Sequence, residues 1–230
     1  ACLGDLMKLE ATTADYLQQS VPGFDMEAPH YWANNVLADG VTAADLTVSE
    51  PALIGWLHTL EAISQLCMAS ARYRAAANYA RRVLKAEGYP TRAAGTVLLA
   101  LARLEDQDGF FALAHQLEEE IGADALENSP WYLLARTILL FKTNKMRPAT
   151  RALREFANRC EGGAFFLLNP MYQTPYLPCR PEPHDPWDLS HQAVWEADGI
   201  ISDTPDFAPW ANACEDVSQL AQEFARRYGF

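Results

Sequence analysis

The sequence predicts an all-α fold, built as a stack of helix pairs and followed by an extended proline-rich segment and C-terminal helices. Between Pro51 and Cys160, apolar residues recur at steps of three and four, which is the spacing of one helix face. Helix-ending residues punctuate this region, namely Gly88, Pro90, Gly122 and Pro130. About half of the 230 residues are apolar, enough to bury a core without disulfides or metal.

Four parts follow one another along the chain, and we expect them to form a single domain. We predict an N-terminal helical cap over 1–50, three helix pairs over 51–163, an extended strap over 164–187 and C-terminal helices over 188–230. In the cap, apolar spacing predicts a helix at about 4–20 and a short helix around 31–38. Near the C-terminus it predicts helices at about 188–200 and 207–228.

The strap is rich in both proline and aromatic residues. Its prolines exclude a regular helix, so we expect an extended chain; they are Pro170, Pro175, Pro178, Pro181, Pro183 and Pro186. Aromatic residues are interleaved with them, and a free linker would expose these side chains together as a large apolar patch. We therefore expect residues 165–187 to pack over the helices as an ordered strap.

Three units of similar pattern fill the central region. The first has Leu60, Ile63, Ser64 and Cys67 on one helix and Tyr73, Ala76, Ala80 and Val83 on the next. The second has Leu98, Leu101 and Ala102, then Phe111, Ala114 and Ile121. The third has Trp131, Leu134, Ala135 and Ile138, then Met146, Ala149, Leu153 and Phe156. Small residues at Ala76, Ala114 and Ala149 would let the two helices of each unit approach closely.

This pattern resembles the tetratricopeptide repeat, and the third unit matches it best. Glu105 and Glu118 depart from it, since they stand where apolar residues are expected. The resemblance implies a right-handed stack of antiparallel helix pairs, in which the first helices line a concave groove that binds peptides. The groove positions would be His58, Glu61 and Gln65 in unit one, Thr96, Leu99 and Arg103 in unit two, and Ser129, Tyr132 and Arg136 in unit three.

The likeness therefore predicts a non-enzymatic protein-interaction module with a protein or peptide as its partner. Arg103 and Arg136 occupy the same place one unit apart. An unpaired buried arginine is strongly destabilising, so each should meet a carboxylate. That carboxylate belongs either to an acidic ligand or to the chain's own C-terminal segment, and the sequence leaves both open.

Net charge argues against nucleic acid as a partner. The total is −12, divided as −8 over 1–71, +4 over 72–159 and −8 over 160–230. A nucleic-acid-binding face needs an excess of positively charged residues. Apolar runs long enough for a membrane span are also absent from the sequence. Five scattered cysteines without a C-x-x-C pair are typical of free thiols, so we expect a cytoplasmic protein. The opening residues 1–4 include no initiator Met, so we expect the natural chain to extend upstream.

Two alternatives from other classes stay open. Cys179, His184, Asp185 and His191 are residue types that bind zinc or act in hydrolysis, and a proline frame would hold them. Their spacing matches no common ligand pattern, so we predict no catalytic residue, no metal and no cofactor. The other alternative is the helical regulatory part of a transcriptional regulator whose DNA-binding domain lies elsewhere.

Overall fold

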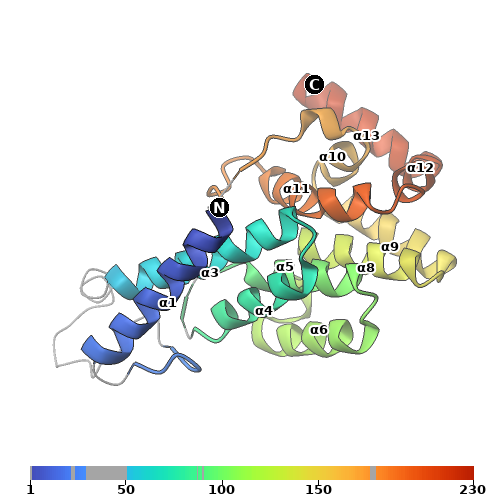
Figure 1. Ribbon diagram of the computed structural model, residues 1–230. Coiled ribbons are helices and arrows are strands. Elements are labelled where there is room, and N and C mark those ends of the chain that lie inside the picture. Colours follow the sequence, from blue (N-terminus) through green and yellow to red (C-terminus); the bar gives the residue numbers. More distant parts are fainter. Residues whose placement is uncertain (1, 22–23, 30–50, 87, 90, 177–179) are drawn as a thin grey trace.

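The computed structural model describes residues 2–21, 24–29, 51–86, 88–89, 91–176 and 180–230 (Figure 1). These residues form helices and no strand, which confirms the predicted all-α class. The short helix predicted around 31–38 lies outside the described residues, as does Pro90. Within the described ranges, no helix combines the length and hydropathy that a membrane span requires.

Helices occupy most of the central region (Figure 1). They are α3 (Pro51–Ala69), α4 (Tyr73–Leu84), α5 (Ala93–Arg103), α6 (Gln107–Ile121), α7 (Ala123–Glu127), α8 (Pro130–Lys142) and α9 (Met146–Arg159). Helix α3 packs on α4, α4 on α5, α5 on α8, and α8 on α9. The apolar faces predicted from the spacing meet in one core, which contains Leu60, Leu98 and Leu134.

Three turns in this region share one backbone geometry. Ala71, Glu105 and Asn144 all lie in the left-handed region, with φ of 58°, 59° and 57°. In each turn the next residue donates its N–H to a carbonyl five residues back, namely Arg72 to Cys67 at 2.8 Å, Asp106 to Leu101 at 3.1 Å and Lys145 to Leu140 at 2.8 Å. This bond closes the end of a helix. Helices α3, α5 and α8 therefore end in the same way.

The turns also set the register of the helices that follow them. The first helical N–H bonds come from Ala76, Phe110 and Ala149, to carbonyls four residues back at 2.9, 3.0 and 2.9 Å. The sequence predicts Ala114 as the second-unit equivalent, but the structure places Phe110 there and Ala114 one turn further on. Phe110 is fully buried, whereas the predicted inward residues Phe111 and Ile121 are exposed. The reason is the capping of α6, where the Asp106 carboxylate accepts the Gly109 N–H at 2.9 Å.

Helix α1 (Cys2–Ser20) packs against α3 and corresponds to the helix predicted at 4–20. Its buried residue Glu10 accepts hydrogen bonds from Trp56 Nε1 at 2.9 Å and from Arg82 Nη2 at 2.6 Å. The Arg82 guanidinium also lies 5.6 Å from the Trp56 ring centroid. A carboxylate, an indole and a guanidinium thus tie α1 to α3 and α4.

The C-terminal part contains more helix than predicted. Its elements are α10 (Gly163–Leu168), the 3₁₀ helix η1 (Pro170–Tyr172), α11 (Asp188–Ser202), α12 (Phe207–Asn212) and α13 (Glu215–Tyr228). The predicted extended strap over 164–187 is thus wrong at its start. Residues 163–169 contain no proline, and the buried rings of Phe165 and Phe166 contact Phe224 of α13 as part of the core.

The single helix predicted over 207–228 is two helices. Cys214 separates them, with an extended backbone at φ −80° and ψ 101°. Two features stabilise a helix start directly after it. Glu215 and Asp216 place negative charge in the first turn of α13. The Ser218 hydroxyl donates a hydrogen bond to the Asn212 carbonyl at 2.7 Å.

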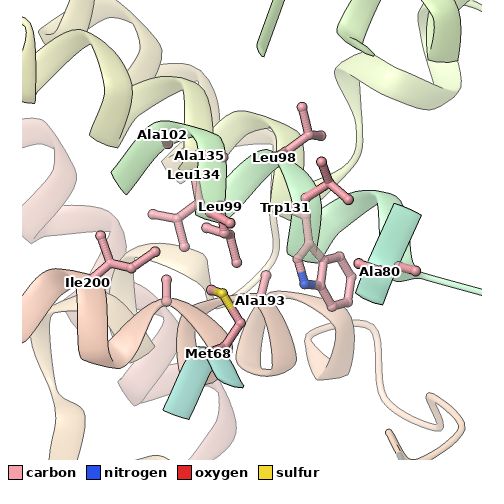
Figure 2. Packing of buried hydrophobic residues seen from close by; sticks show 14 of the residues in the cluster. Met68, Ala80, Leu98, Leu99, Ala102, Trp131, Leu134, Ala135, Ala193 and Ile200 are labelled. Carbon is pink, nitrogen blue, oxygen red and sulfur yellow. The ribbon is translucent and has the colours of Figure 1, made fainter. Parts of the chain in front are cut away.

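Helix α11 lies across α3, α5 and α8 (Figure 1) and contacts all three. Figure 2 shows Ala193 and Ile200 of α11 among Met68, Leu99 and Leu134 of those three helices. All five side chains are buried. Of these residues, Leu99 is a predicted groove position, so α11 covers the predicted groove at this point of α5.

Helix α5 packs tightly against Trp131 of α8 at Gly95. A Cβ built on Gly95 would lie 2.4 Å from Cγ and Cδ1 of Trp131. We predict that Gly95→Ala destabilises the protein by about 1–3 kcal/mol, because the Trp131 ring has to move. Urea unfolding measures this.

The matched control is Gly55→Ala, because a Cβ on this exposed helical glycine meets nothing within 4 Å. It should stabilise by about 0.5–1 kcal/mol through higher helix propensity. Equal effects of the two substitutions would contradict the close approach at Gly95.

Candidate functional site

Two of the nine predicted groove residues are enclosed beneath α11. Leu99 is fully buried, and Thr96 is almost so. The Thr96 hydroxyl accepts a hydrogen bond from Arg180 Nη2 at 2.6 Å and lies 3.5 Å from Glu196 Oε2. The C-terminal segment therefore covers these two predicted groove residues.

The two groove arginines both pair with carboxylates of the chain. Arg103 Nη2 lies 3.5 Å from Asp203 Oδ2, just after α11, and Arg136 Nη2 pairs with Glu155 of α9. Each guanidinium also stacks on an aromatic ring, since Arg103 lies 5.3 Å from the Tyr73 ring centroid. The sequence left open whether an acidic ligand or the chain itself meets these charges; in the structure the chain does.

Ser129 and Tyr132, two further predicted groove residues, make contacts within the helical core. Ser129 caps α8, with its Oγ 3.4 Å from the Tyr132 N–H. The Tyr132 ring stacks on Phe110, with centroids 6.0 Å apart. Together with the pair of Arg136 and Glu155, this contact places Tyr132 and Arg136 against α6 and α9.

A buried ion pair joins the strap to α11. The side chains of Arg180 and Glu196 are only 6% and 3% exposed. Arg180 donates through Nε to Glu196 Oε1, and through Nη2 to Oε2 at 3.0 Å. Burial by itself would lower the pKa of Arg180, but the Glu196 carboxylate more than offsets this effect and the pKa is raised.

Two further donors complete the coordination of the Glu196 carboxylate. Trp131 Nε1 donates to Oε2 at 2.9 Å, and the Tyr176 hydroxyl donates to Oε1 at 2.9 Å. Burial, followed by the adjacent Glu196 charge, raises the pKa of Tyr176, so it stays a hydrogen-bond donor. The guanidinium of Arg180 lies 5.8 Å from the Trp131 ring centroid. None of the fully buried side-chain nitrogen and oxygen atoms of these residues lacks a hydrogen-bond partner, which a buried ion pair requires.

Sequence reasoning missed this cluster, although one signal pointed to it. Glu196 is on the same face of α11 as the buried residues Ala193, Ala197 and Ile200. A carboxylate on an apolar helix face needs donors from elsewhere in the fold. Its partners Tyr176 and Arg180 lie in the strap, and Trp131 is 65 residues away.

The predicted Cys179, His184, Asp185 and His191 cluster has mainly structural contacts. Cys179 lies outside the described residues, and His184 and Asp185 are exposed. His191 Nε2 accepts the Thr174 N–H at 2.9 Å, so that lone pair is occupied. The Asp188 carboxylate accepts the backbone N–H groups of His184 and Asp185 at 2.7 and 2.9 Å. Among the described residues, no group of three or more potential ligands is placed to hold a metal ion.

The first-unit groove positions line an open polar pocket. Its volume is about 420 Å³, and its lining comprises His58, Glu61, Gln65, Tyr89, Thr91, Arg92, Arg180 and Glu182. All three predicted groove residues of α3 are part of this lining. These residues of α3 form one wall of the pocket, and the strap supplies another through Arg180 and Glu182.

Two acceptors on α3 mark the inner wall of this pocket. The Glu61 carboxylate accepts hydrogen bonds from the Tyr89 hydroxyl at 2.9 Å and from the Thr91 hydroxyl. Gln65 is 5% exposed, and its Oε1 has no hydrogen-bond partner within the described part of the chain. An unsatisfied buried acceptor destabilises by about 1–3 kcal/mol. Gln65 also borders a smaller cavity of about 160 Å³ between α3 and α11.

Arg92 holds the opposite wall against the strap. Its guanidinium lies 3.7 Å from the exposed Glu182 carboxylate and 3.2 Å from Gln192 Oε1. Gln192 in turn donates to the Pro181 carbonyl at 2.9 Å. The pocket therefore depends on the docked position of residues 180–182.

Comparison of the chain with protein-family models, with curated proteins and with solved structures finds no match. The functional assignment accordingly rests on the geometry of the described residues.

The buried pair allows a direct test of what holds the strap. We predict that Arg180→Met destabilises the protein by about 3–5 kcal/mol, because it leaves the Glu196 carboxylate buried without its cation. Arg159→Met removes an exposed pair with Glu127, at 2.9 Å, and should change stability by about 0–1 kcal/mol. Urea unfolding compares them, and a small effect of Arg180→Met would show that Glu196 is not held as described.

The contact between Thr174 and His191 predicts a pH dependence. Burial lowers the pKa of His191, against a smaller opposing effect of Asp188. At pH values between that lowered pKa and about 6.5, His191 is protonated in the unfolded chain but not in the folded chain. The free energy of unfolding should therefore fall as the pH decreases from 7 through this window.

His191→Gln retains an acceptor for the Thr174 N–H but does not titrate. Its free energy of unfolding should fall less over the same pH range. Urea unfolding at pH 7 and pH 5 measures the difference, and equal losses in the two proteins would rule out the neutral His191 contact as the cause.

Proposed function

We propose that this chain is a non-enzymatic interaction module of tetratricopeptide-like type, and that it binds a segment of a partner protein in the pocket at the α3 end of its groove. The observation that carries the proposal is the polar pocket itself. It lies at the predicted groove positions His58, Glu61 and Gln65, and it includes a buried acceptor without a partner.

The repeated turns support the repeat interpretation. Ala71 and Glu105 are 34 residues apart and Glu105 and Asn144 are 39 apart, a period that fits helix-pair repeats. The same left-handed residue and the same hydrogen bond end α3, α5 and α8. In this proposal these three are the first helices of successive antiparallel pairs, and α4, α6 and α9 are the second helices.

The position of α11 supports a groove that the chain itself partly fills. Helix α11 contacts α3, α5 and α8, and Asp203 at its end pairs with Arg103. A tetratricopeptide-like groove accepts peptide ligands along these same first helices. We propose that α11 is a built-in occupant, so that an outside partner has access only to the pocket beside it.

A peptide selection tests this proposal. Random peptides displayed on phage would be selected on the immobilised protein, and the affinity of enriched peptides measured by fluorescence anisotropy. We predict that His58→Trp weakens binding about tenfold or more, because the larger ring narrows the pocket from its exposed rim.

The matched control is His115→Trp, the same substitution on the exposed face of α6, and it should bind like the wild type. Enriched peptides that bind both variants equally would place the binding site elsewhere. Failure to enrich any peptide would contradict peptide binding itself.

A further inference from the structure

The charges around the pocket are unequally paired. Arg180 is committed to Glu196 through two hydrogen bonds, and Arg92 lies 3.7 Å from Glu182. Glu61 has only hydroxyl donors, and within the described part of the chain no cation forms an ion pair with it. With three carboxylates and two guanidinium groups, the pocket and the adjoining ion pair carry a surplus of one negative charge. Glu61 is the carboxylate of the three that forms no ion pair within the described residues, and the Arg180 charge acts on it from a longer distance.

The acceptors of α3 are arranged along one side of that helix. His58, Glu61 and Gln65 are spaced by three and four residues, so they share a face. Glu61 is the only charged residue of α3. A carboxylate accepts about four hydrogen bonds, of which two are used here. The Glu61 carboxylate can therefore accept further hydrogen bonds, and Gln65 Oε1 can accept one from an N–H donor.

We infer that the pocket takes the cationic head of a lysine or arginine side chain from the partner peptide, with N–H groups donated to the Glu61 carboxylate and Gln65 Oε1. This inference rests on the proposed function. An ammonium or guanidinium group supplies donors and the missing charge together. An acidic side chain would meet Glu61 and Glu182 instead, and an apolar one would leave Gln65 Oε1 unpaired.

The volume of the pocket and the net charge of the protein both agree with this ligand. About 420 Å³ falls within the range of about 300–1,000 Å³ that small-ligand pockets span. The net charge of −12 attracts basic segments over distance and accelerates their encounter with the protein. Arg103 and Arg136, which motivated an acidic ligand from the sequence, are already paired within the chain.

The test uses four acetylated and amidated tripeptides, each with glycines around a central Lys, Arg, Gln or Glu. Binding would be followed by nitrogen–proton NMR, through the side-chain amide signals of Gln65 and the backbone N–H of Thr91. We expect the Lys or the Arg peptide to saturate these shifts at about a tenfold lower concentration than the Gln and Glu peptides. The better of the two identifies the cation as ammonium or guanidinium.

Glu61→Gln should weaken the cationic peptide about tenfold, whereas Glu118→Gln, the same change on the exposed face of α6, should leave it within about twofold. Gln65→Met gives a second variant that removes the acceptor without altering charge, and it should weaken binding as well. The dispersion of the spectra verifies that each variant folds.

Three results would overturn the inference: equal binding of the Gln or Glu peptide, no saturable shift with any of the four, or equal loss in Glu61→Gln and Glu118→Gln. Selected peptides that depend on His58 but contain no basic residue would also overturn it, while leaving the proposed function intact.

Discussion

The guanidinium of Arg180 and the carboxylate of Glu196 are both almost completely buried. Their pairing fixes how the C-terminal part packs on the central helices. An ion pair at such depth is tolerated only when every lone pair and proton has a partner. Trp131 of α8 and Tyr176 of the strap donate to the Glu196 carboxylate, and Thr96 of α5 accepts from Arg180. A strap in another position would leave a buried charge without compensation, which makes the docked arrangement specific.

A similar combination of groups recurs at the other end of the molecule. Glu10 of α1 accepts from the indole of Trp56 and from Arg82, whose guanidinium faces that ring. In both clusters a flanking helix carries the carboxylate and a central helix carries the tryptophan. Apolar contact brings the flanking helices onto the central ones, and these polar clusters then select one orientation among the many that apolar packing alone would allow.

The helices of the central region could be predicted because they follow from local spacing, and the first-unit side of the pocket came with them. The register of α6 could not, since Phe110 and Phe111 are adjacent and either satisfies the spacing; the Asp106 cap decides between them. Helix α10 was missed because the prolines that follow it dominated the interpretation of 164–187. The Arg180 and Glu196 pair depends on residues far apart in sequence, for which local patterns contain no information.

The pocket has walls from two parts of the chain that are separate in sequence, with His58 and Gln65 on α3 and Arg180 and Glu182 on the strap. A ligand in it is therefore thermodynamically linked to the docking of the strap. Occupancy stabilises the docked state by mass action, and the apparent affinity falls in proportion to the fraction of molecules in which the strap is displaced. Binding at this site would therefore report the fraction of molecules in which the strap is docked beside α3.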